Sequence, residues 1–251
     1  MNIYPELFED KFKFIFVHIP KTGGKSFRYI LMNQFEKCNG FKLSNPERIE
    51  WISQQTPEDL LRFDLIHGHF PYYFLPPMPK RFKFFTILRD PIERIISQYN
   101  YWMNSKRKFD LSIQHIVREK KMTFEEYVNS DLEEVKYWLF AYMTHLSDPT
   151  CYKGNDVEVV ERRIEQAVRA LATDFDFVGI TEKYDEGLEY LSKRYPGFKK
   201  EYKPQNVTPQ WEKTAEVTDE LRSWLKDYLK PEYLIYNMAK KIFESRINGS
   251  S

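Results

Sequence analysis

Six consecutive residues near the start of the chain have the side chains that a phosphate-binding loop needs. They are Lys21, Thr22, Gly23, Gly24, Lys25 and Ser26. The two lysines supply positive charge, and the two hydroxyl groups can donate hydrogen bonds to phosphate oxygens. The glycines let the backbone turn its N–H groups inward, and a helix that begins there adds a partial positive charge. This segment predicts a site for a phosphorylated ligand.

A second segment offers groups suited to the same kind of ligand. Arg89 and Ser97 lie eight positions apart. Arginine presents a planar fork to a phosphate, and serine adds a neutral donor. From these residues alone, the simpler interpretation is an Arg89 ion pair with Asp90 or Glu93 and a serine on a solvent-facing surface.

Two histidines, His67 and His69, flank Gly68. Residues two apart on a strand project to the same side, and a glycine between them permits a bend or a close approach of a ligand. Half of a metal site and hydrogen-bonded core histidines are the alternative interpretations. A metal needs more ligands, and no Cys or His cluster elsewhere supplies them, so we expect no metal.

The pattern of apolar residues indicates the elements that must position these groups. Strands are expected at residues 14–19, 63–70, 82–88 and 175–180, and helices from the loop to about 36, from 91 onward, and at about 157–171, 182–194, 218–229 and 231–245. Asp90 suits the N-cap and Pro91 the first position of its helix. Thr123 and Glu126 fit a capping box, and the polar residues 42–57 are expected to be irregular, followed by a short helix at 57–62. Alternating strands and helices predict an α/β fold, a central parallel sheet with helices on both faces.

Length and charge limit the possible partners. The chain has 251 residues and a net charge of +1. We expect one domain over residues 1–251, with a disordered tail at about 246–251. A net charge near zero gives no overall field for nucleic acid, so no nucleic-acid partner is expected. Residues 80–108 hold eight Lys or Arg and two Asp or Glu, which suits an anionic ligand.

The loop fits the nucleoside-triphosphate P-loop, G-x-x-x-x-G-K-[ST], only in part. Gly24, Lys25 and Ser26 match the end of that pattern, but Ile19 stands where its first glycine belongs. An ATP-dependent kinase or NTPase is therefore an alternative hypothesis rather than the leading one.

Three segments resemble the carbohydrate sulfotransferases of the heparan sulfate 2-O-sulfotransferase type. Residues 18–26 read H-I-P-K-T-G-G-K-S, similar to the family's 5′-phosphosulfate loop H-I-P-K-T-G-G-T-S, with Lys25 in place of the usual threonine. Residues 88–99 resemble the family's 3′-phosphate element, R-D-P-x-x-R-x-x-S-x-Y/F. His67-Gly68-His69 resembles the H-G-H element that lies between the two. A weaker similarity covers residues 177–182 and 206–209.

The resemblance implies a P-loop-containing nucleotide-hydrolase-like fold of three layers and a function. The enzyme would transfer a sulfuryl group in line from 3′-phosphoadenosine 5′-phosphosulfate to a sugar hydroxyl, without a metal. The loop residues would bind the 5′-phosphosulfate, with Lys21 stabilising the leaving group. Arg89 and Ser97 would bind the 3′-phosphate, and Thr208 would contact the nucleotide. His69 would be the general base with His67 as its neighbour, although the assignment could be reversed.

The resemblance also implies a partner and a compartment. The acceptor would be a carbohydrate, with acidic oligo- and polysaccharides among the candidates. Residues 101–174, which match no known motif, could determine its choice. No transmembrane run or signal peptide is recognisable in the sequence. We expect a soluble cytoplasmic enzyme or, alternatively, the lumenal catalytic domain of a Golgi enzyme. A non-catalytic nucleotide- or glycan-binding module is the remaining alternative; the oligomeric state is not predicted.

Overall fold

Five parallel strands form a single sheet in the order β2-β3-β1-β4-β5. Their bounds are β1 Lys13–Val17, β2 Gly40–Leu43, β3 Leu65–Gly68, β4 Phe82–Leu88 and β5 Phe177–Ile180. These positions come from a computed structural model, which describes residues 12–43, 45–104, 112–132, 135–136, 139–147, 157–202 and 215–249. Four of the strands were expected from the sequence. The fifth, β2, was not, because it is a four-residue edge strand with one buried side chain.

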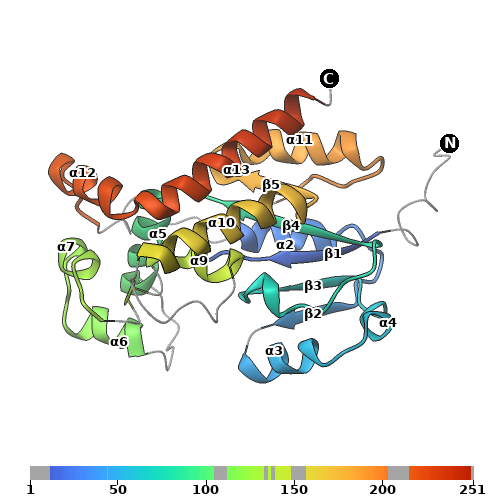
Figure 1. Cartoon of the computed structure of the whole chain (residues 1–251), viewed down its shortest axis with the longest axis horizontal. Coiled ribbons are helices and arrows are strands. Elements are labelled where there is room, and N and C mark those ends of the chain that lie inside the picture. Colours follow the sequence, from blue (N-terminus) through green and yellow to red (C-terminus); the bar gives the residue numbers. More distant parts are fainter. Residues whose placement is uncertain are drawn as a thin grey trace.

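Helices cover both faces of the sheet (Figure 1). They are α2 Gly24–Met32, α3 Pro46–Ser53, α4 Pro57–Leu60, α5 Pro91–Asn104, α6 Ser112–Glu119, α7 Phe124–Val128, α9 Ala141–Leu146, α10 Val157–Thr173, α11 Tyr184–Arg194, α12 Asp219–Tyr228 and α13 Lys230–Asn248, with 3-10 turns η1 Tyr72–Phe74 and η3 Thr181–Lys183. In Figure 1, α9 and α10 lie in front of the sheet and α2 behind it. The predicted α/β fold, a central parallel sheet with helices on both faces, is confirmed.

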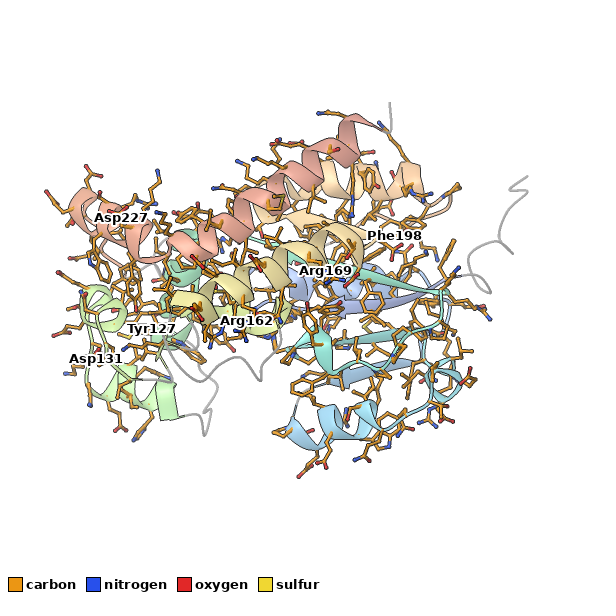
Figure 2. The ribbon with its side chains drawn as sticks, in the orientation of Figure 1. Tyr127, Asp131, Arg162, Arg169, Phe198 and Asp227 are labelled. Carbon is orange, nitrogen blue, oxygen red and sulfur yellow. The ribbon has the colours of Figure 1, made fainter. Side chains whose placement is uncertain are left out.

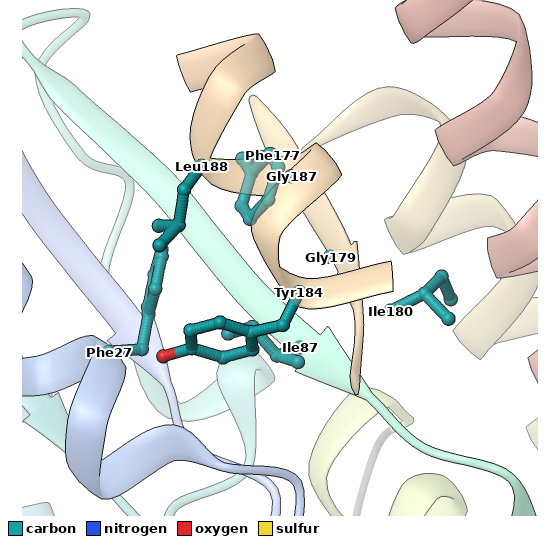
Figure 3. Close-up of a pocket in the computed structure, with 8 residues that line it drawn as sticks. All are labelled: Phe27, Ile87, Phe177, Gly179, Ile180, Tyr184, Gly187 and Leu188. Carbon is teal, nitrogen blue, oxygen red and sulfur yellow. The ribbon is translucent and has the colours of Figure 1, made fainter. Parts of the chain in front are cut away.

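The helix that follows the first loop is held against the sheet by aromatic rings. Phe27 of α2 lies 5.2 Å from Phe16 and 5.7 Å from Phe177, measured between ring centroids. Figure 3 shows Phe27 with Tyr184 and Leu188 of α11 around this contact. The space between them is about 10 Å³, no more than the minimum for a single water molecule. This region is therefore packed core, and it fixes the start of α2 relative to β1.

A second cluster of buried side chains lies beside the sheet, among α5, α6, α7 and α12. Tyr127 of α7 is buried in it, while Asp227 lies on α12 above it in Figure 2. The predicted capping box opens α7, since the Thr123 side chain accepts from the Glu126 N–H and the Glu126 side chain from the Thr123 N–H. Helix α5 follows directly on β4 and contributes Ile92, Ile95, Tyr99 and Trp102 to this cluster, so it joins the sheet to the second cluster.

Three local expectations are corrected. Residues 46–53 form helix α3, whose N-cap Asn45 accepts a hydrogen bond from the Arg48 N–H, where irregular structure was expected. The first helix ends at Met32 rather than near residue 36. Helix α13 continues to Asn248, so the expected tail at 246–251 begins with helical residues. Within the described residues, no helix combines the length and apolar character needed to cross a bilayer.

Candidate functional site

The three predicted motifs all lie at the carboxyl end of a strand. Strand β1 leads into the loop at His18, β3 leads into His69, and β4 leads into Arg89. Val17 is in register with Gly68, and the His18 N–H donates to the Gly68 carbonyl at 2.9 Å. In open α/β sheets, ligands bind at the carboxyl ends of the strands. The sheet therefore brings the sequence-predicted groups to the edge where ligands bind.

The phosphate loop is shaped by two residues in the left-handed region. Lys21 has φ 69° and Gly23 has φ 76°. Gly23 caps α2, and its carbonyl accepts from the N–H of Ser26 at 3.1 Å. The Thr22 side chain is fully buried, and its hydroxyl donates to the Ile19 carbonyl at 2.9 Å. Because that proton is used within the loop, Thr22 stabilises the turn, in contrast to the exposed phosphate donor that its residue type suggested.

Lys21 lies next to both Arg89 and helix α5. Its ammonium group lies 4.1 Å from the centroid of the Tyr101 ring, and its carbonyl accepts a hydrogen bond from Arg89 Nη1 at 3.3 Å. Burial, with a smaller contribution from the Arg89 charge, lowers the pKa of Lys21 to about 8. Lys21 and Arg89 are thus two neighbouring cations, and among the described residues neither forms an ion pair, as expected of an anion-binding site.

The carboxylates near Arg89 are occupied by other groups. Asp90 accepts from the N–H groups of Ile92 and Glu93 at the start of α5, and Glu93 pairs with Arg222 at 3.2 Å. In the part of the chain that the structure describes, Arg89 forms no ion pair. The simpler interpretation of Arg89 as half of an ion pair with a neighbour is therefore wrong.

Ser97 lies on α5, the helix whose Tyr101 ring contacts Lys21. It is half-buried in the second turn of α5, four residues before Tyr101. Residues four apart share one face of a helix. The face that carries Tyr101 is directed at Lys21, so Ser97 belongs to the side of α5 that faces the loop.

Thr181 connects the two phosphate motifs. Its hydroxyl lies 3.0 Å from the Thr22 carbonyl and 2.9 Å from the Leu88 carbonyl. The next residue, Glu182, accepts from the Asp90 N–H at 3.0 Å. The sequence drew attention to this segment only through a weak similarity and did not indicate a role. In the structure, the Thr181 hydroxyl fixes the first loop relative to the end of β4.

Four of the five histidines of the chain gather at one place: His18, His67, His69 and His145. The ring centroids of His18 and His69 are 4.3 Å apart, and those of His69 and His145 are 6.2 Å apart. Of the two histidines in the H-G-H motif, His67 is buried at 6% exposure whereas His69 is exposed. Sequence reasoning did not assign roles to His18 or His145.

The tautomer of His69 follows from its hydrogen bond. Nδ1 lies 2.6 Å from the His18 carbonyl oxygen. A carbonyl oxygen only accepts, so Nδ1 carries the proton and Nε2 keeps a free lone pair. Part of the His69 surface is open to solvent, but the protein packed around the ring desolvates it and so lowers the pKa of His69. The Lys42 charge adds to this shift, and the hydrogen bond to His18 opposes it. The ring therefore remains neutral and able to accept a proton.

Two glycines permit the close approaches that build this cluster. A Cβ at Gly24 would lie 2.2 Å from Cδ2 of His18. A Cβ at Gly68, where φ is 157°, would lie 1.9 Å from the carbonyl oxygen of Leu43 in β2. The sequence suggested that Gly68 permits a bend or the close approach of a ligand. The group that approaches it closely is the Leu43 carbonyl of the neighbouring strand β2.

Within the described residues, no group of three or more His, Cys, Asp or Glu side chains is arranged to hold a metal ion. Thr208 lies outside the described residues.

Comparisons with known proteins agree with these motifs. The sequence model of the sulfotransferase family matches residues 6–244. Heparan sulfate 2-O-sulfotransferase 1 of Gallus gallus is 24% identical over 208 residues, which cover 76% of this chain and 56% of that protein. A heparin sulfate O-sulfotransferase of Drosophila melanogaster is 24% identical over 271 residues, covering 94% and 73%.

A solved sulfotransferase from Alicyclobacillus acidocaldarius superposes with a TM-score of 0.46 and 15% identity, covering 93% of this chain and 96% of that one. The chain spans only 56% of the length of the Gallus gallus relative.

Proposed function

Because the chain belongs to the sulfotransferase family, we propose that it transfers a sulfuryl group from 3′-phosphoadenosine 5′-phosphosulfate to a hydroxyl group of a carbohydrate. One observation carries most of this proposal: an exposed His69 with a free Nε2 follows the strand paired with β1, which ends in the cationic loop. A base and an anion site at one sheet edge are what this transfer requires.

The donor would bind across the two phosphate motifs. The loop amides of Gly23 and Gly24, with Lys21, Lys25 and Ser26, would bind the 5′-phosphosulfate at the start of α2. In this proposal Thr22 contributes its backbone and the turn that it stabilises. The 3′-phosphate would lie between Arg89 and Ser97, and Thr208 would contact the nucleotide from the later loop.

The transfer itself would use one proton acceptor and one cationic leaving-group site. His69 Nε2 takes the proton of the acceptor hydroxyl while that oxygen forms a bond to sulfur. The bond between sulfur and the 5′-phosphate oxygen breaks, and its electron pair stays on the phosphate. Lys21 and the loop amides stabilise the charge that develops there. None of these steps requires a metal. His67 is buried behind His69 and supports it in this scheme.

An acidic glycan is the acceptor class that the local charges favour. The charges of Arg28 and Lys42 both lower the pKa of His67, which places these cations near the histidine cluster. In the described part of the chain neither side chain forms an ion pair, and Arg28 Nε is buried without a hydrogen-bond partner. Relatives are named as heparan sulfate sulfotransferases, and a carboxylate or sulfate on the acceptor would pair with these cations.

The first test separates this function from an ATP-dependent one. Calorimetric titration with adenosine 3′,5′-bisphosphate should give metal-independent binding, while ADP should bind weakly with or without magnesium. Preference for magnesium–ADP would refute the proposal. Transfer of labelled sulfate from the donor to a panel of acidic and neutral glycans then tests the reaction, and binding without transfer to any of them would favour a non-catalytic module.

A further inference from the structure

Helix α9 contacts both halves of the proposed site. It belongs to the stretch for which no motif is recognisable, and it runs from Ala141 to Leu146. The hydroxyl of Tyr142 accepts a hydrogen bond from the Arg89 N–H at 3.0 Å and donates to the Arg89 carbonyl. Both backbone polar groups of Arg89 are therefore held by one fully buried side chain.

His145, three residues further along α9, contacts the other half. Its ring is 2% exposed and lies nearly perpendicular to the His69 ring, at an interplanar angle of 85°. Its Nδ1 lies 2.8 Å from the Ala141 carbonyl, so Nδ1 donates and the ring orientation is fixed from within the helix. Residues three apart lie on one side of a helix. One side of α9 thus serves both Arg89 and His69.

The helix is itself fixed by buried polar contacts. Glu232 of α13 accepts from the Met143 N–H at 3.2 Å, and Arg94 of α5 donates to the carbonyl of Leu139. The side chains of Glu232 and Arg94 are fully buried. The first contact joins α9 to the long C-terminal helix, and the second joins the segment just before α9 to α5, which carries Ser97. The support is therefore rigid rather than a surface loop.

We propose that α9 is the positioning element of the site, in which Tyr142 holds Arg89 for the donor and His145 holds the His69 ring for the acceptor. The inference rests on the proposed function and extends it. Neither residue touches substrate in this scheme. Because the two roles belong to different residues of one helix, a change at Tyr142 should impair donor affinity and a change at His145 should impair turnover, each without the other.

The donor half is tested by Tyr142→Phe, which removes one hydroxyl and leaves the ring. The affinity for adenosine 3′,5′-bisphosphate should fall about three- to tenfold, as expected for the loss of a buried hydrogen bond. Turnover at saturating donor should change less than twofold, because the lost contact affects donor binding and so raises KM for the donor without slowing the transfer step. The matched control is Tyr99→Phe, because Tyr99 is also buried and its hydroxyl donates to a backbone carbonyl, that of Met122, at 2.8 Å.

The acceptor half is tested by two changes at His145. Asparagine can keep a donor near the Nδ1 position but removes the ring, whereas phenylalanine keeps a ring and removes both nitrogens. If the ring positions His69, His145→Asn should lower kcat about tenfold and His145→Phe should lower it less than threefold, with unchanged bisphosphate affinity in both. His115→Asn, a change at an exposed histidine of α6, is the control.

Each outcome decides between roles. Equal loss of kcat in both His145 variants would assign its nitrogens a part in proton transfer and overturn the positioning role. Parallel losses of donor affinity, kcat and melting temperature would indicate general destabilisation and also overturn it. If the wild-type protein binds no adenosine 3′,5′-bisphosphate, the proposed function is refuted. An active protein in which Tyr142→Phe behaves like Tyr99→Phe would refute the role of α9 alone.

Discussion

Donor affinity should depend on pH through a single lysine. The free site holds Lys21 at a pKa of about 8, because burial and the Arg89 charge disfavour the ammonium form. A bound phosphate anion favours that form and raises the pKa in the complex, so binding takes up a proton between the two pKa values. The Lys21 contribution to affinity should therefore be fully present at pH 7 and should be lost as the pH rises through 8.

The size of this effect follows from the pKa. At pH 9 about a tenth of free Lys21 is protonated, so the affinity for adenosine 3′,5′-bisphosphate should be roughly tenfold weaker than at pH 7. The ligand contributes little, because a phosphate monoester has its second pKa near 6 and is mostly the dianion throughout this window. Calorimetry at pH 8 in two buffers of different ionisation enthalpy should show uptake of about half a proton.

The control replaces the titrating group with one that stays charged. In Lys21→Arg the guanidinium remains protonated throughout this range, so the step in affinity between pH 7 and 9 should disappear even if the absolute affinity changes. Affinity of the unchanged protein that is flat from pH 7 to 9.5, with no proton uptake, would show that Lys21 does not contact the bound anion.

Three further changes test other parts of the site. His69→Ala should lower turnover about 100-fold or more while bisphosphate affinity stays within about twofold, and His115→Ala should leave both unchanged; full activity of His69→Ala would exclude it as the base. Arg89→Ala should weaken bisphosphate binding about tenfold or more and ADP binding hardly at all, since ADP has no 3′-phosphate; equal losses for both nucleotides would contradict its assignment. Gly68→Ala introduces a Cβ 1.9 Å from a backbone oxygen of β2 and should lower the free energy of unfolding by about 3 kcal/mol in chemical denaturation. At Gly40 an added Cβ meets its nearest neighbour at 3.8 Å, so Gly40→Ala should be nearly neutral, and equal stability of the two variants would refute the steric argument.

The parts of the site that depend on local sequence could be predicted. A glycine at φ 76° before a helix, and Asp90 with Pro91 at the start of α5, are features that neighbouring residues encode directly. The ends of the parallel strands then place these segments at one edge of the sheet. The location of the loop, the H-G-H segment and Arg89 therefore followed from short patterns, whereas their roles stay predictions.

The surroundings of these groups could not be predicted, because they come from distant segments. Tyr142 reaches the Arg89 backbone across 53 residues, and its helix is short and has no ligand-binding pattern. Thr22 illustrates a different limit, since a hydroxyl in a phosphate loop suggests a ligand contact until its partner, the Ile19 carbonyl, is seen. Side-chain partners are decided by packing in three dimensions, and a residue type alone does not reveal them.

The charges around the histidine cluster have two effects on the proposed reaction. Desolvation is the main cause of the lowered pKa values of His18, His67 and His69. The Lys42 charge adds to the shift at His69, and the Arg28 charge adds to it at His18 and His67. A lower pKa weakens a base, but it also keeps the imidazole unprotonated at neutral pH, where a protonated ring could not accept the hydroxyl proton. An acidic acceptor that pairs with these cations would offset their charge and raise the pKa of His69 on binding. The base would then be strongest when the acceptor is in place, which links recognition of an anionic sugar to the proton transfer itself.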